Sequence, residues 1–155
     1  MDFIERAVSD GSDREARSHM MMAALQGGFA IYMGLGPIHT LGHIFANSPL
    51  HHGALITASA PPLMRFYAAN ADDALVAKLA RLRDVMGLAA GADIAAAIAA
   101  LNTRLGLSNS VRALGYPDTD PEILAGLAME VHFNATAPRA PDRAEYRDII
   151  ADALG

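Results

Sequence analysis

The chain has 155 residues, of which 52% are hydrophobic, with a formal net charge of −5 and no cysteine. This length is that of a single domain with a sizeable core, and the missing cysteine excludes disulfides, thiolate metal sites and cysteine nucleophiles. The twelve basic residues form no stripe, which argues against nucleic acid as a partner.

Alanine and leucine dominate the composition, and no long alternating Val/Ile/Thr run occurs. Both residues are strong helix formers, whereas strands are enriched in β-branched residues. The sequence therefore predicts an all-α, compact multi-helix domain with about seven helices, spanning residues 1–155. The lack of cysteine also fits a cytoplasmic protein.

Residues 1–12 are expected to form a lead-in, with Ser12 as the N-cap of a first long helix over residues 13–33. That helix begins polar and becomes apolar nearly all round, which predicts burial on all sides. With the next two helices it makes up residues 13–67, a region of buried helices. No charged residue occurs between Ser18 and Met64.

The Gly34-Leu35-Gly36-Pro37 turn is expected to end the first long helix and to start a second over residues 37–46. As a G-x-G motif it follows no predicted strand, so it lacks the context of a dinucleotide fingerprint. A third helix is predicted from His52 to Tyr67, kinked or split at Pro61-Pro62 because neither proline donates a backbone N–H.

Residues 72–155 read as amphipathic helices with clear start and stop signals. Helices are predicted over residues 72–86, 93–105, 120–133 and 142–154, with a short turn or helix at 110–114 and an extended linker at 134–141.

A membrane-spanning segment is not expected, because the uncharged window is interrupted by Gln26-Gly27-Gly28, Asn47-Ser48-Pro49 and other breakers. The charged start of the chain also argues against a signal peptide. The sequence thus predicts no membrane partner.

Four of the six histidines lie between Gly34 and Gly53. His39 and His43 are four residues apart, which places both rings on one helix face. His51 and His52 follow after a short loop, and the hairpin between the two helices brings them near the first pair. Such imidazoles can bind a divalent metal, or they can be core histidines satisfied by backbone carbonyls. His19 and His132 stand alone and are assigned structural or exposed roles.

The motifs at residues 11–17, 34–43 and 50–53, in this order and spacing, resemble the C-terminal helical domain of the iron-containing (group III) alcohol dehydrogenases. This family includes lactaldehyde, butanol and maleylacetate reductases. The resemblance is specific over the first 70 residues and looser beyond them, where Ala137-Pro138-Arg139 stands in place of the family's Asn-Pro-Arg.

The resemblance implies hydride transfer between NAD(P) and an alcohol or aldehyde, with Fe²⁺ or Zn²⁺ acting as a Lewis acid on the substrate oxygen. His39 and His52 occupy positions of family metal ligands. His43 matches the histidine that faces nicotinamide and substrate, and is the catalytic candidate. His51 is expected to be a neighbour of the site and an accessory ligand.

The family's nucleotide-binding domain and its other two metal ligands, an Asp and a His, belong upstream and do not occur in this sequence. Catalytic metal sites normally use three protein ligands. The third must come from His43, His51 or a partner chain, and NAD(P) can bind only if a separate nucleotide-binding domain is supplied.

Three hypotheses follow. The first is that the chain is the metal-site domain of an alcohol dehydrogenase-like enzyme, inactive without a nucleotide-binding partner or a missing N-terminal part. The second is a stand-alone helical remnant that acts as a binding or oligomerisation module without dehydrogenase activity. The third is a small histidine-site metalloprotein with altered chemistry. In each, apolar helix faces left uncovered favour a homodimer or larger homo-oligomer.

Overall fold

The computed structural model describes residues 2–155, which form helices and no strand, as the all-α prediction requires. They divide into two compact units, one ending at Gly34 and the other covering Leu35–Gly155. The α-helices are α1 (Asp2–Ser9), α2 (Arg14–Ala30), α3 (Gly36–Ile44), α4 (His52–Ala69), α5 (Asp73–Met86), α6 (Ile94–Arg104), α7 (Pro121–Glu130) and α8 (Arg143–Leu154). The 3₁₀-helices are η1 (Ile31–Met33), η2 (Arg112–Leu114) and η3 (His132–Thr136).

In the first unit, the segment predicted to be a lead-in at residues 1–12 contains a helix, α1. Phe3 of α1 stacks on His19 of α2, with ring centroids 3.8 Å apart, so the short helix is held by its packing on α2. The N-cap of α2 is Asp13 and not Ser12: the Asp13 carboxylate accepts a hydrogen bond from the Ala16 N–H at 3.0 Å. The Ser12 hydroxyl instead bonds Asp10 in the preceding turn.

The prediction that α2 is buried on all sides is wrong for this chain. Ala16 is the only buried residue of α2, and a Cβ added at Gly27 or Gly28 would meet nothing within 4 Å. The reason is that α1, the helix that packs on α2 within this unit, has only eight residues. Large apolar side chains of α2 and η1 consequently remain exposed at Met21, Met22, Leu25, Phe29, Ile31, Tyr32 and Met33.

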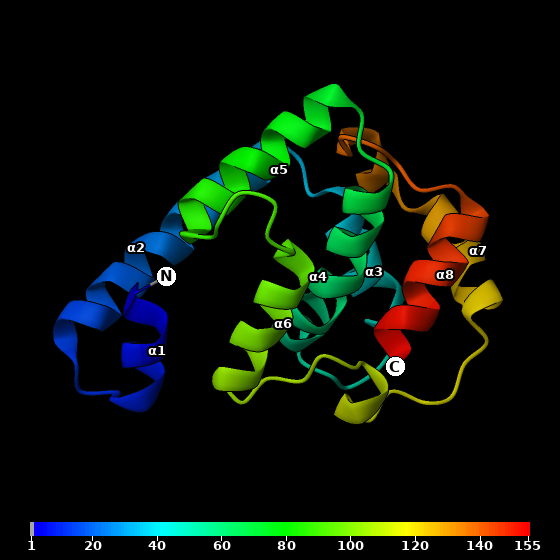
Figure 1. Ribbon diagram of the computed structural model, residues 1–155. Coiled ribbons are helices and arrows are strands. Elements are labelled where there is room, and N and C mark those ends of the chain that lie inside the picture. The colour runs from blue at the N-terminus through cyan, green and yellow to red at the C-terminus, as the bar shows by residue number, and fades with distance from the viewer. Residues whose placement is uncertain (1) are drawn as a thin grey trace. The chain divides into compact units, whose positions relative to one another are not determined.

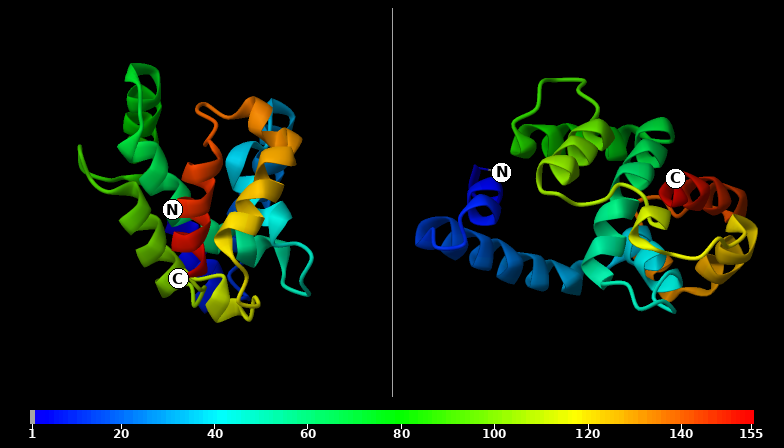
Figure 2. Two further views of the ribbon diagram at one scale, coloured as in Figure 1. Left: turned by 90° about the vertical axis from the view of Figure 1, so that its right-hand side faces the viewer. Right: turned by 90° about the horizontal axis from the view of Figure 1, so that it is seen from below.

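The second unit is built around α4, which packs against α3, α5, α6 and α8. In Figure 1 α4 lies between α6 and α8, and Figure 2 shows α7 beside α8. The largest fully buried side chains of the second unit include Phe45, Leu55, Leu124, Tyr146 and Ile150. Apolar residues at helical spacing on each amphipathic element supply this core, as the sequence pattern indicates.

Four helices of this unit begin where the sequence predicts them, each at an aspartate cap. Asp72, Asp93, Asp120 and Asp142 each accept a hydrogen bond from a backbone N–H in the first turn of the following helix. A carboxylate at this position satisfies an otherwise unpaired donor and interacts favourably with the helix dipole. Gly87 ends α5 with φ of 70°, which favours glycine.

Helix α4 continues through Pro61-Pro62, so of the two predicted alternatives, a kink and a split, the split is wrong. Pro61 has no N–H to donate to the carbonyl of Thr57, four residues earlier. Asn102 of α6 takes over this role, since its Nδ2 donates to the Thr57 oxygen at 3.0 Å and to Asn109 Oδ1 at 2.9 Å. A buried amide from the neighbouring helix thus replaces a missing backbone hydrogen bond.

The extended linker predicted over residues 134–141 is wrong in its first part, because Asn134–Thr136 belong to η3. Beyond it, Arg139 makes two hydrogen bonds to the carboxylate of Glu145 and lies over the Phe66 ring, 4.6 Å from its centroid. The hydrogen bonds from Arg139 lower the pKa of the Glu145 carboxyl. These contacts fix the connection between η3 and α8.

Within residues 2–155 no individual helix has the length and hydropathy needed to cross a membrane. The segments Arg14–Met33 and Gly36–Ile44 meet the criterion only when they are taken together across the break between them.

The Asn102 bridge gives the first prediction. Asn102→Ala leaves the Thr57 carbonyl without its donor, and we expect it to lower the free energy of unfolding by about 1–3 kcal/mol. In a Pro61→Ala background the backbone N–H restored at this position can serve that carbonyl, so the same Asn102→Ala change should cost clearly less. Urea denaturation of the four proteins measures both effects, and equal costs in the two backgrounds would contradict the bridge.

Candidate functional site

Two of the predicted site histidines meet where α3 packs on α4. His39 lies on α3 and His52 is the first residue of α4, with ring centroids 5.5 Å apart and an interplanar angle of 32°. One ion or small molecule bound between the helices can contact both imidazoles, because each ring nitrogen is a donor or a ligand. The hairpin of α3 and α4 therefore brings together side chains thirteen residues apart.

Gly42 is what allows this approach. A Cβ built on Gly42 would lie 2.6 Å from Ile56 Cδ1 and 3.0 Å from His52 Cε1. Both distances are shorter than an ordinary carbon–carbon contact. A glycine at this position thus sets how close α3 comes to α4, and with it how close His39 comes to His52.

The environment of His39 favours the neutral imidazole. The side chain is half-buried, and burial, together with the neighbouring His52, lowers the pKa of His39. A neutral imidazole has a lone pair available for a metal ion, whereas a protonated ring has none. The His39 ring is therefore suited to act as a ligand.

His43, the catalytic candidate, lies one turn after His39 and is exposed. Phe133 of η3 connects the two positions: its ring meets His39 edge-on at 6.4 Å and His43 edge-on at 6.0 Å, measured between centroids. His43 also lines a hollow of about 400 Å³ together with His132 and Phe133. The structure therefore places His43 beside the imidazole pair, facing a cavity of its own.

His51, the accessory candidate, is the N-cap of α4. The Gly53 N–H donates to His51 Nδ1 at 3.2 Å. A Cβ on Gly53 would lie only 3.2 Å from this ring, so the His-His-Gly sequence shapes the start of the helix. Capping occupies Nδ1 and leaves Nε2 as the ring nitrogen that can bind a ligand.

The sequence reading missed the importance of η3, because it extended the preceding helix to Phe133. Helix α7 ends at Glu130, and Val131 adopts an extended conformation with ψ of 123°. This break turns His132 and Phe133 onto a separate 3₁₀-helix beside α3. The sequence signal for this helix end was β-branched Val131 before His-Phe-Asn, and it is a weak signal.

Asn134 attaches this 3₁₀-helix to the rest of the unit. Its Oδ1 accepts hydrogen bonds from Thr40 Oγ1 at 3.1 Å and from the Tyr146 hydroxyl, and its Nδ2 donates to the Ala128 oxygen at 2.9 Å. Burial raises the pKa of Tyr146 to about 12, which further disfavours loss of the proton that its hydroxyl donates. Thr40 is adjacent to His39, and the network thereby holds the α3 face that presents the site.

His39 and His52 suit a divalent metal as two of its ligands. Residues 2–155 contain no group of three or more His, Cys, Asp or Glu side chains arranged to hold an ion. Because structural and catalytic metal sites normally have at least three protein ligands, the pair fits as part of a site whose remaining ligands must come from elsewhere.

The arrangement of helices with facing histidines defines the class of protein. Residues 1–154 match the C-terminal part of the Fe-containing alcohol dehydrogenase family, and the chain belongs to this family. It is 38% identical over 161 residues to 4-hydroxybutyrate dehydrogenase of Cupriavidus necator and 30% identical over 166 residues to NAD-dependent methanol dehydrogenase of Bacillus methanolicus.

These matches include 97% and 99% of the chain but only 41% and 42% of the relatives. The solved structure of a 1,3-propanediol oxidoreductase superposes with a TM-score of 0.84 at 27% identity, over 96% of this chain and 41% of that one. The chain thus spans about two fifths of the length of the proteins it resembles, and its fold is that of their helical domain.

Gly42 generates the second prediction. Gly42→Ala forces its Cβ against Ile56 and His52, and we expect it to lower the free energy of unfolding by about 1–2 kcal/mol. Ile56→Val removes the nearest atom, so the double variant should recover part of that loss. Thermal denaturation of the three variants and the parent measures this, and an unchanged melting temperature for Gly42→Ala would contradict the close contact.

Proposed function

We propose that this chain is the metal-site domain of an oxidoreductase that interconverts alcohols and aldehydes with NAD(P), acting with a nucleotide-binding domain that this sequence does not encode. The observation that carries the proposal is the His39–His52 pair, in a chain that belongs to the Fe-containing alcohol dehydrogenase family. The relatives are named for 4-hydroxybutyrate, methanol and 1,3-propanediol, which all carry a primary hydroxyl. A primary alcohol is therefore the proposed substrate class.

In this proposal His39 and His52 hold Fe²⁺ or Zn²⁺, which supplies Lewis-acid polarisation of the substrate oxygen when bound. The lowered pKa of His39 keeps its ring neutral and available as a ligand. His43, exposed and next to the hollow, orients the substrate hydroxyl and moves its proton as a general acid or base. Phe133, edge-on to both His39 and His43, keeps the two functions adjacent.

The proposal includes a cytoplasmic location, which the cysteine-free composition favours. It also includes a requirement for another polypeptide segment. The described residues provide two facing imidazoles, so the third ligand has to come from His43, His51 or a partner chain, and the nucleotide site from a separate domain.

Metal binding tests the roles of the pair. We expect His39→Ala and His52→Ala each to weaken Zn²⁺ binding by at least about tenfold, since loss of an outer-shell partner alone costs that much. His19→Ala is a matched control, because His19 stacks on Phe3 in the other unit. Isothermal titration with Zn²⁺ and metal analysis measure binding, and equal metal content in the parent and a His39/His52 double variant would refute the assignment.

Turnover tests His43. The chain is combined with the part of the Cupriavidus necator relative that lies outside the match, and NAD(P)H formation from a primary alcohol is followed. His43→Ala should retain metal and slow turnover by about 10²–10⁴-fold, the usual contribution of general acid–base catalysis. Loss of metal in this variant would instead make His43 a ligand.

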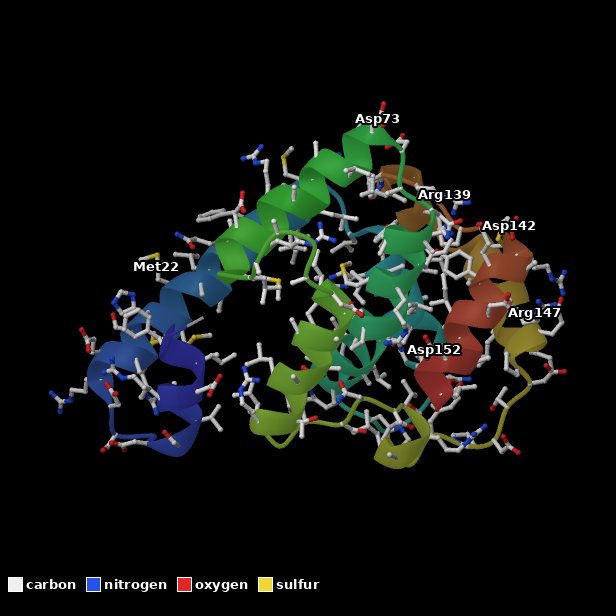
Figure 3. All side chains as sticks on the ribbon, viewed as in Figure 1. Met22, Asp73, Arg139, Asp142, Arg147 and Asp152 are labelled. Carbon is white, nitrogen blue, oxygen red and sulfur yellow. The ribbon has the colours of Figure 1, made fainter. Side chains whose placement is uncertain are left out.

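A second candidate function is that of an association module, and the exposed apolar side chains of α2 and η1 favour it. Met21, Phe29, Tyr32 and Met33 are between 64% and 91% exposed. Figure 3 shows Met22 projecting outward from α2. Contiguous apolar surface of this kind is characteristic of interaction sites.

Under this candidate the chain forms a homodimer or larger homo-oligomer through α2. We expect light scattering to give a mass above that of one chain, and Met21→Glu combined with Phe29→Glu to shift it to the monomer mass. Val76→Glu combined with Val85→Glu on α5, also exposed apolar positions, is the matched control and should leave the mass unchanged. A monomeric parent would contradict self-association.

A further inference from the structure

The amide of Asn134, on η3, connects this 3₁₀-helix to three α-helices of the second unit. Its Oδ1 accepts from Thr40 Oγ1 on α3 at 3.1 Å and from the Tyr146 hydroxyl on α8, and its Nδ2 donates to the Ala128 oxygen on α7 at 2.9 Å. Both lone pairs of the amide oxygen are therefore used. A polar network satisfied in this way favours one arrangement of the elements that it connects.

The two hydroxyl groups of this network are closed off from water. Thr40 and Tyr146 are each 0% exposed. A buried hydroxyl that loses its partner cannot bond to solvent instead, so its hydrogen-bonding capacity remains unsatisfied. A movement of α3 that separates Thr40 from Asn134 is consequently unfavourable.

A second hydrogen bond attaches η3 to the same face of α3. The Gly36 N–H donates to Thr136 Oγ1 at 3.3 Å, and the Thr136 hydroxyl donates in turn to the Phe133 oxygen at 3.1 Å. Gly36 and Thr40 are four residues apart, so they lie one above the other on α3. Two attachments one turn apart on one face fix the rotation of the helix about its axis.

The imidazole of His39 lies on the neighbouring face of α3. His39 directly precedes Thr40, and successive residues are about 100° apart around a helix. A rotation of α3 that breaks the Thr40 hydrogen bond therefore turns His39 relative to His52 by the same angle. Buried Leu41 and Ile44 also hold α3, but apolar contacts are non-directional, whereas a hydrogen bond weakens steeply with its angle.

Phe133 offers a way to observe this alignment. It is adjacent to Asn134 in η3, and its ring meets His39 edge-on at 6.4 Å and His43 edge-on at 6.0 Å, measured between centroids. Because hydrogen bonds hold η3 against α3, the contacts of this ring report how the imidazoles are aligned with η3.

We infer that Thr40, Asn134 and Tyr146 are positioning residues, which fix the rotation of α3 and thereby orient His39 towards His52. They act through the helix and not as ligands. For metal binding the inference rests on the function proposed above, in which His39 and His52 hold the ion. Gly42 then sets the distance between α3 and α4, and the network sets the direction of the ring.

The first test uses the 155-residue chain without metal. Protein labelled at phenylalanine and histidine is studied by NMR, and nuclear Overhauser effects report the contacts of the Phe133 ring with the His39 and His43 rings. Thr40→Val removes the hydroxyl but keeps the branched shape, and we expect it to reduce the intensity of these effects. Thr40→Ser keeps a hydroxyl and should retain the intensity of the parent.

Titration with Zn²⁺ measures the consequence for the imidazole pair. We expect Thr40→Val and Asn134→Ala each to weaken binding about tenfold, the lower end of the effect of removing an outer-shell partner of a metal ligand. Thr40→Ser should bind like the parent. Tyr146→Phe should weaken binding less than Thr40→Val, because the hydrogen bond from Thr40 to Asn134 remains.

Asn102→Ala is the matched control for a loss of stability. It also removes an amide that bridges two helices, but Asn102 donates to Thr57 of α4 and to Asn109. At a temperature at which circular dichroism shows every variant to be folded, its affinity for Zn²⁺ should equal that of the parent. A loss of affinity as large as that of Asn134→Ala would attribute the effect to stability and overturn the inference.

The remaining outcomes separate this inference from the function on which it rests. Ring contacts or a Zn²⁺ affinity in Thr40→Val equal to those of the parent would also overturn it. If His39→Ala leaves Zn²⁺ binding unchanged, the metal-binding role in the proposed function is refuted. The ring contacts of the metal-free chain then still decide whether the network orients His39.

Discussion

The contact of α3 with α4 at Gly42 is the constraint on which the rest of the second unit depends. Ile56 and His52 occupy the space that a side chain at Gly42 would need, so the helices approach closely at this point. This approach brings His39 within 5.5 Å of His52 and buries Leu41 and Leu55 in the same interface. The missing side chain at Gly42 therefore sets the separation of the two helices, while the hydrogen bonds of Asn134 hold the α3 face that carries His39.

Around this contact, the side-chain amides of Asn102, which is buried, and Asn134, which is half-buried, satisfy hydrogen bonds that the backbone cannot. Asn102 donates to the carbonyl that Pro61 leaves without a partner, and α4 consequently remains continuous through two prolines. Asn134 accepts from Thr40 and Tyr146 and donates to the end of α7, which fastens η3 against α3. Both amides come from segments remote in sequence, and each removes an unsatisfied polar group whose burial would be costly.

Under the proposed function the chain supplies one side of a metal and substrate site. Two imidazoles face each other, a third borders a separate hollow, and the described residues contain no further ligand for the pair. The exposed apolar surface of α2 is a second sign that the fold has surfaces suited to a partner. This arrangement is consistent with a domain that spans about two fifths of the length of its relatives.

The sequence by itself determined the helices and the site pair. Capping aspartates such as Asp93 and Asp142 act through contacts within four residues, and the motif around His39 and His52 carried the family resemblance, so both could be predicted locally. The tertiary structure decided what depends on contacts between remote segments. The burial of α2 was mispredicted because hydropathy does not say whether a partner helix is present. The continuity of α4 depends on Asn102, forty-one residues after Pro61, and the hollow beside His43 exists because α7 ends at Glu130 and η3 folds back onto α3.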